Sequence, residues 1–240
     1  MKQIIKAILA QTPYRIVRDN GANRFQAIEV TLRGMRDRGF SPGLVIDAGA
    51  HLGSFSLAAK EIFPAARFHL VEPQPACTQA LTALCAREGF IFHECALAER
   101  AGRIDLSRAD TPNTGVHVRP DGGDEAVSIV ARTLDGLFAD VISRGSRVLL
   151  KLDLQGYELH ALRGATNVLP HIEAILTEVS FFAQTYEPSI AELLAFLDAA
   201  GFELYDVAAL AGRTRDNRLR QGDFVFIRKG SELLKDGQWA

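Results

Sequence analysis

The stretch LVIDAGAHLG, Leu44 to Gly53, joins a short apolar run to a carboxylate and then to a turn that contains two glycines. No polar residue alternates with the apolar ones, which is typical of a parallel strand covered on both faces. Gly49 and Gly53 lack a Cβ, so the backbone can turn sharply there and approach a ligand. The pattern predicts a strand that ends at Asp47 and points at a nucleotide-like ligand, followed by a helix over Ser54–Glu61.

A second acidic residue follows the next apolar run. Phe68 to Val71 lead directly into Glu72 and Pro73, about 20 residues beyond the glycine turn. Proline stops a strand, so Glu72 is expected at a strand tip, where the ribose hydroxyls of a nucleotide would lie.

Four segments in this order resemble the FkbM family of S-adenosylmethionine-dependent methyltransferases: VIDAGAHLG, HLVEP, KLDLQGYE and ILTEV. The resemblance implies a Rossmann-like class I methyltransferase fold in which the glycine turn binds the methionine part of the cofactor and the acid after the second strand binds the ribose. The residues that it assigns to S-adenosylmethionine are Asp47, Gly49, Ala50, Gly53 and Glu72. Ala96 and Leu97 are further candidates, because such folds place backbone groups around the adenine at that position, although an ordinary loop is an equal alternative.

The remaining pattern predicts an α/β fold with a seven-stranded, mainly parallel sheet. The first strand is followed by strands at residues 68–71, 90–92, 148–152, 174–177, 203–207 and 224–228. The last two resemble the closing reversed hairpin of methyltransferase sheets, which implies that only the last strand, residues 224–228, is antiparallel. Residues 102–132 depart from the alternation, and their turn signals predict a β-hairpin insertion beside the strand tips. His117 and Arg119 in this insertion either contact substrate or are exposed strand residues.

The predicted organisation is an N-terminal helical lead-in at residues 1–43, a methyltransferase domain at residues 44–230 and a tail at residues 231–240. Residues 1–10 carry one apolar face, which suits a helix packed on its own domain or on a partner subunit better than a helix on a membrane surface or a flap.

Catalysis requires a base or a metal near the acceptor oxygen. Asp153 and Glu178 are predicted to end neighbouring parallel strands, where they would serve as base or, together, as ligands of Mg²⁺. The alternatives are structural: Asp153 would cap the next helix, and Glu178 would pair with a lysine or arginine. His51 and His160 are alternative bases, and Lys151 must find a carboxylate partner if it is buried.

The composition indicates which classes of substrate and which cellular location to expect. The formal net charge is −2, from 27 basic and 29 acidic residues mixed along the 240-residue chain, which makes nucleic acid an unlikely substrate. The three cysteines do not have the spacing of a metal site, which indicates free thiols. No apolar run reaches the roughly 20 residues that a membrane-spanning helix needs. We therefore expect a cytoplasmic protein that acts on a small molecule or glycan, and the sequence leaves a homo-oligomer open.

The function expected from these features is O-methyl transfer from S-adenosylmethionine to a hydroxyl of a sugar, glycan or small secondary metabolite. The alternative is a nucleotide-binding dehydrogenase or a catalytically silent Rossmann-like binding domain. The usual NAD fingerprint has three glycines and no carboxylate two residues ahead of the first, so the sequence favours the methyltransferase.

Overall fold

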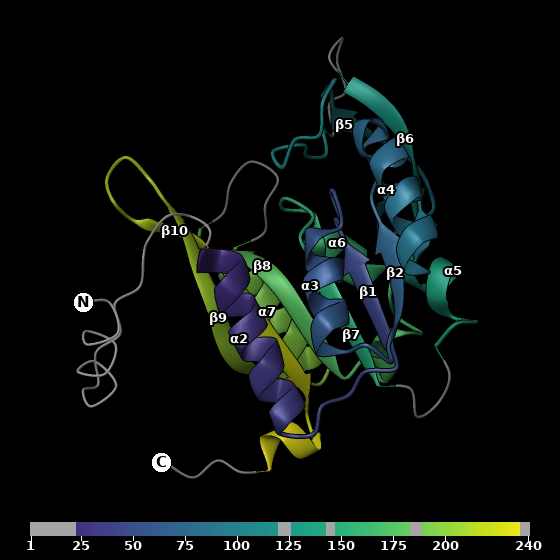
Figure 1. Ribbon diagram of the computed structural model, residues 1–240. Coiled ribbons are helices and arrows are strands. Elements are labelled where there is room, and N and C mark those ends of the chain that lie inside the picture. Colours follow the sequence, from purple (N-terminus) through teal and green to yellow (C-terminus); the bar gives the residue numbers. More distant parts are fainter. Residues whose placement is uncertain (1–22, 120–125, 143–146, 183–188, 236–240) are drawn as a thin grey trace, which may run out of the picture.

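A twisted seven-stranded sheet forms the centre of the molecule, with helices on both faces (Figure 1). The computed structural model describes residues 23–119, 126–142, 147–182 and 189–235. The predicted helix at residues 1–10 and the Pro-Asp-Gly-Gly turn at residues 120–123 lie outside the described residues.

The sheet has the strand order β3-β2-β1-β7-β8-β10-β9. Its strands are β1 (Leu44–Ala48), β2 (Arg67–Val71), β3 (Ile91–His93), β7 (Val148–Leu152), β8 (Ala174–Ser180), β9 (Phe202–Arg213) and β10 (Leu219–Arg228). Only β10 is antiparallel to its neighbours, β8 and β9, whereas the other pairings are parallel. The expected Rossmann-like class I methyltransferase fold, with its last strand reversed, is confirmed.

The helices divide between the two faces of the sheet. The α-helices are α2 (Asn23–Asp37), α3 (Ser54–Ile62), α4 (Pro75–Glu88), α5 (Leu134–Phe138), α6 (Glu158–Arg163) and α7 (Ile190–Ala199), and η1 (Leu169–His171) and η2 (Glu232–Leu234) are short 3-10 helices. Side chains of α2, α3, α4 and η2 join one buried apolar cluster, and those of α5, α6, η1 and α7 join the other. The sheet is therefore covered on both sides, which explains why its central strands lack polar alternation.

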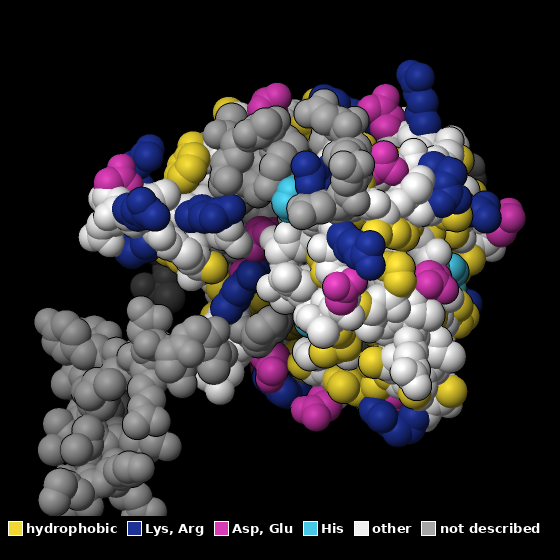
Figure 2. Space-filling model, turned by 90° about the horizontal axis from the view of Figure 1, so that it is seen from above, with side chains coloured by type: hydrophobic (Ala, Val, Ile, Leu, Met, Phe, Trp, Pro, Cys, Tyr) yellow, Lys and Arg dark blue, Asp and Glu magenta, His cyan; other side chains and the backbone are white. Residues whose placement is uncertain are grey.

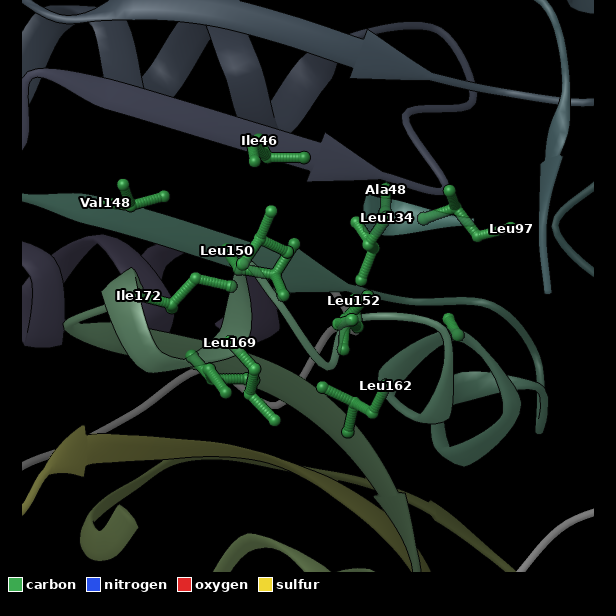
Figure 3. Close-up of a cluster of buried hydrophobic side chains, with 14 of the residues drawn as sticks. Ile46, Ala48, Leu97, Leu134, Val148, Leu150, Leu152, Leu162, Leu169 and Ile172 are labelled. Carbon is green, nitrogen blue, oxygen red and sulfur yellow. The ribbon is translucent and has the colours of Figure 1, made fainter. Parts of the chain in front are cut away.

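The strand β1 contributes alternate residues to these two clusters. Leu44, Ile46 and Ala48 pack on the face of α5, α6 and α7, whereas Val45 packs on the opposite face. Figure 3 shows part of the cluster on the face of α5, α6 and α7. In this cluster Ile46 and side chains of β7 pack together with Leu162, Leu169 and Ile172. This two-sided burial fixes the register of the central strands, so their C-terminal tips end at one edge of the sheet.

A small second sheet replaces the simple hairpin expected at residues 102–132. Antiparallel strands β5 (Gly102–Ser107) and β6 (Ala126–Arg132) confirm the insertion, and β4 (Ala96–Leu97) pairs parallel with β6. Between these strands, Val118 forms only an isolated bridge with Leu106. Ala96 and Leu97, for which a loop was the alternative, are strand residues.

One predicted boundary bears on the site. The strand β8, expected over residues 174–177, continues to Ser180 because β10 pairs with it as far as that residue, so Glu178 lies inside a strand and not at its tip. In the described ranges, no helix has the length and apolar character needed to cross a bilayer.

Candidate active site

A cavity of about 380 Å³ opens at the C-terminal edge of the parallel strands. Its walls come from the segments that follow β1, β2 and β7, from the small sheet and from the first turn of α2. Open α/β sheets bind ligands at this edge, and the volume lies within the range of small-molecule sites. A smaller cavity of about 90 Å³ adjoins it, and Arg24, Gly49, His51 and Asp153 line both.

The two glycines of the turn are required by packing within the protein. Both adopt left-handed backbone angles, with φ of 77° at Gly49 and 79° at Gly53. A Cβ at Gly49 would lie 1.9 Å from the carbonyl oxygen of Asp153, and one at Gly53 would lie 2.2 Å from Cδ2 of Leu84. Gly49 therefore lets the tips of β1 and β7 approach, and Gly53 lets α4 pack against the start of α3.

Glu72 presents its carboxylate to the cavity at the tip of β2. The side chain is only 3% exposed, and it accepts hydrogen bonds from the backbone N–H groups of His51 (2.7 Å) and Gln74 (3.1 Å). Burial raises the pKa of Glu72, and these two backbone hydrogen bonds oppose the rise. The bonds tie Glu72 to the glycine turn and fix its orientation, as a ribose-binding carboxylate requires.

Asp47 is completely buried below the turn and does not line the cavity. Its carboxylate accepts a hydrogen bond from the hydroxyl of Ser56 (2.7 Å) and pairs with the ammonium of Lys151 (3.1 Å). Burial alone would lower the pKa of Lys151, but the attraction of Asp47 and Asp153 outweighs it and raises that pKa. Lys151 also donates a hydrogen bond to the carbonyl of Gly49 (2.7 Å), so Asp47 and Lys151 together hold the glycine turn in place. The expected carboxylate partner of Lys151 is confirmed.

The small sheet supplies the apolar wall of the cavity. Ala96 and Leu97 line it together with Ile104, Leu106 and Val118. A flat heterocycle such as adenine fits between apolar side chains and nearby backbone groups. His117 also lines the cavity, whereas Arg119 is not among the lining residues.

Asp153 faces the cavity from the tip of β7. Its Oδ1 accepts a hydrogen bond from the side-chain amide of Gln155 (2.8 Å), and the side chain is 26% exposed. Gln155 has a φ of 52°, an uncommon backbone conformation for a residue other than glycine. Buried Glu158 accepts a hydrogen bond from the N–H of Leu154 (2.6 Å), and burial raises the pKa of Glu158 to about 7. These contacts fix the loop that carries Asp153.

Glu178 does not line either cavity, in contrast to the expectation that it ends a strand beside Asp153. It is buried between the guanidinium of Arg24 (2.6 Å) and the side-chain amides of Gln155 (3.2 Å) and Gln221. Burial and the charge of Asp153 raise the pKa of Glu178 to about 8. The structural alternative, a pairing of Glu178 with an arginine, is the arrangement observed.

Arg24 is the cation of this cluster. Its side chain binds both carboxylate oxygens of Asp223 (2.5 and 2.6 Å), Glu178, and more distantly Asp153 (3.6 Å). Asp223 lies opposite Glu178 in the β8–β10 register. The guanidinium therefore takes the position between Asp153 and Glu178 that the Mg²⁺ hypothesis assigned to a metal. The described residues contain no group of three or more side chains suited to a metal ion, so the residues present do not fit Mg²⁺.

The two histidines differ in position. His51 lines the cavity with a φ of 50°, and its buried Nε2 has no hydrogen-bond partner in the described part of the chain. His160 stacks on Tyr157, with ring centroids 4.3 Å apart, and is not among the lining residues. Of the two, only His51 is placed to contact a ligand.

Sequence reasoning missed Arg24, Gln155 and Asp223. Arg24 precedes β1 by some twenty residues and its partners follow much later, so no local spacing could reveal the cluster. Gln155 stands in the turn beside Asp153, and that position was the one available signal for it.

The fold and the crevice define an α/β protein with a cavity at the C-terminal edge of its parallel strands. The model of the Methyltransferase FkbM domain matches residues 47–204, and the chain therefore belongs to the FkbM methyltransferase family. The chain is 26% identical over 195 residues to "Methyltransferase sdnD" of Sordaria araneosa. The match covers 67% of this chain and 73% of that protein. The family implies S-adenosylmethionine as the methyl donor.

Two solved structures also resemble the chain. Methyltransferase FkbM from Methylobacillus flagellatus KT is 20% identical with a TM-score of 0.47, and the match covers 77% of this chain and 43% of that one. Ribosomal protein L11 methylase from Lactobacillus delbrueckii subsp. bulgaricus is 12% identical with a TM-score of 0.49, and the match covers 91% and 90% of the two chains.

Proposed function

We propose that the protein transfers the methyl group of S-adenosylmethionine to a hydroxyl of a sugar, glycan or small secondary metabolite. In this proposal Glu72 binds the ribose hydroxyls, and Ala96 and Leu97 border the adenine. The turn that contains Gly49, Ala50 and Gly53 lies under the methionine part. Asp47 pairs with Lys151, and Lys151 in turn holds this turn in place.

The observation that carries the proposal is the position of Asp153, which lines the cavity with one carboxylate oxygen that is held only by distant ion pairs. Its Oδ2 accepts no hydrogen bond from the described residues, and the nearest cations, Arg24 and Lys151, lie 3.6 and 4.0 Å away. An acceptor hydroxyl placed against Oδ2 would give up its proton to Asp153 while its oxygen bonds to the methyl carbon and the carbon–sulfur bond breaks. A base in this position is worth roughly 10²–10⁴-fold in rate.

Incubation with methyl-labelled S-adenosylmethionine tests the reaction. Matched acceptors would be used, one of each pair carrying a hydroxyl and the other an amine at the same position. We expect label in the hydroxyl compounds as acid-stable ethers, together with one equivalent of S-adenosylhomocysteine. Label that is found only in the amines would overturn the assignment of O-methyl transfer.

A further inference from the structure

The tip of the β9–β10 hairpin concentrates positive charge. Arg213, Arg215, Arg218 and Arg220 lie within eight residues that contain one acidic residue, Asp216. We call residues 213–220 the basic tip. Four arginines and one aspartate give it a net charge of +3, whereas the whole chain carries −2. All four arginines are exposed.

The basic tip projects beyond the edge of the sheet at which the cavity opens. Gln221 lines the cavity and pairs with Ser180 at the end of β8, and the hairpin continues past that point to the Leu219–Arg213 pair and the turn. At about 3.4 Å per strand residue, Arg218 lies roughly 10 Å from Gln221. Figure 1 shows the hairpin and the small sheet rising on either side of the strand tips.

The arginines of the basic tip retain hydrogen-bonding capacity. Arg213 donates to the carbonyl of Asn217 (2.8 Å), and Arg218 donates to Asp216 (2.7 Å) while it stacks on Phe182. Arg215 makes no hydrogen bond or ion pair within the described ranges. Viewed from above, the projecting hairpin shows several dark blue side chains beside a single magenta one (Figure 2). A guanidinium offers five N–H donors, so most donors of Arg215 and Arg218 are available to a ligand.

The floor of the site lacks this excess of positive charge. Its cations, Arg24 and Lys151, are paired with the carboxylates of Asp223 and Asp47, and Asp153 lines the cavity. A ligand with an anionic group would be attracted to the rim rather than to the floor, so its uncharged hydroxyl end would face Asp153. The separation of charge thus orients an acceptor that carries a negative group at one end.

We propose that the methyl acceptor carries a phosphate group, which the basic tip binds through Arg215 and Arg218 while the hydroxyl to be methylated lies against Asp153. The proposal rests on the proposed function. Phosphate suits this surface because a guanidinium binds its oxygens in a bidentate manner and because a dianion gains most from several arginines. Because Arg218 lies roughly 10 Å beyond Gln221 along β10, the phosphate and the hydroxyl of the acceptor would be on the order of 10 Å apart or more, as in a phosphorylated glycan.

Titration of the full chain, saturated with S-adenosylhomocysteine, with inorganic pyrophosphate at low ionic strength tests this surface. The variant is Arg215→Gln/Arg218→Gln, and the control is Arg36→Gln/Arg87→Gln. The control removes the same charge from exposed positions at the C-terminal ends of α2 and α4, at the opposite edge of the sheet. We expect wild type and control to bind alike and the hairpin variant to bind at least about tenfold more weakly.

Equal pyrophosphate affinity in all three proteins, or no binding by wild type, would overturn the proposal. Unchanged affinity for S-adenosylhomocysteine in the hairpin variant shows that its cofactor site is intact. A failure of the proposed function is recognised separately, since label from methyl-labelled S-adenosylmethionine would then appear in no hydroxyl compound, whatever the affinity for pyrophosphate. With matched sugars and sugar phosphates, the hairpin substitutions should raise KM for the phosphates and leave kcat nearly unchanged.

Discussion

At the scale of single residues, Asp153 has the most direct chemical role in this account. We expect Asp153→Asn to lower kcat by roughly 10²–10⁴-fold, because the amide cannot accept the hydroxyl proton. Binding of S-adenosylhomocysteine should persist. A chelator should leave the wild-type rate unchanged, since Arg24 fills the position between the carboxylates. Full activity of Asp153→Asn would remove the base and direct attention to His51, which lines the same cavity.

The glycine at position 49 offers a test of packing. Gly49→Ala brings a Cβ against the carbonyl of Asp153 in a left-handed backbone conformation, so we expect a loss of more than about 2 kcal/mol in the free energy of unfolding. The group that obstructs a side chain at this position is the protein's own backbone.

Gly34→Ala is the matched control. Gly34 lies inside α2 with nothing within 4 Å of its added Cβ. Alanine is favoured there by about 0.5–1 kcal/mol. Urea denaturation of both variants should therefore give changes of opposite sign, and a neutral effect of Gly49→Ala would contradict the close approach of β1 and β7.

At the scale of secondary-structure elements, β2 and β3 are linked by a pair of histidines. Nδ1 of His69 lies 3.0 Å from Nε2 of His93, and both rings pack on Phe138. Burial, with smaller contributions from His93 and Arg67, lowers the pKa of His69 from 6.5 to about 4. The imidazole ring of His69 is therefore uncharged in the folded protein at neutral pH.

This pairing predicts a loss of stability in acid. Between pH 6.5 and pH 4 the unfolded chain protonates the residue at position 69 while the folded protein does not. The free energy of unfolding should fall as the pH falls, by up to about 1.4 kcal/mol per pH unit for this residue. Urea titrations of wild type and His69→Leu across this range measure the difference. If the difference between the two proteins does not vary with pH, His69 does not titrate in this way.

The docking of α2 depends on Arg24. Arg24→Met would leave Glu178 and Asp223 buried without their cation, and breaking such a buried pair costs about 3–5 kcal/mol. Arg33→Met is the control, because within the described ranges Arg33 forms a partly exposed pair with Glu29, worth about 1 kcal/mol or less. Adding Glu178→Gln to Arg24→Met should recover part of the loss in urea denaturation. Similar losses in Arg24→Met and Arg33→Met would contradict the cluster.

At the scale of the whole molecule, sequence predicted the central sheet because local patterns determine it. Leu44–Ile46 and Val148–Leu150 are continuous apolar runs that only a doubly covered strand explains, and the reversal of β10 followed from the family resemblance. The strand limits of β8 were missed, since its extension depends on pairing with β10, which lies some forty residues later.

The site was predictable only where its residues follow strand tips. Glu72 and Asp153 line the cavity as that rule requires, but Asp47 and Glu178 are buried in ion pairs whose partners sequence spacing could not identify. The domain limits at residues 43 and 230, a homo-oligomer and a cytoplasmic location stay predictions. Ile28, Leu32 and Leu233 belong to the same buried cluster as Val45, so the described flanks share the core of the central domain.

Calorimetric titration with S-adenosylhomocysteine and NAD tests the central claim, that the crevice beside Glu72 binds the methyl donor. We predict one equivalent of S-adenosylhomocysteine bound by wild type and no heat from NAD. Glu72→Ala should weaken binding by about 1.5–3 kcal/mol, the value of hydrogen bonds to a charged group, whereas Glu61→Ala on the exposed side of α3 should not change it. Binding of NAD in place of S-adenosylhomocysteine, or undiminished affinity in a folded Glu72→Ala variant, would contradict the account.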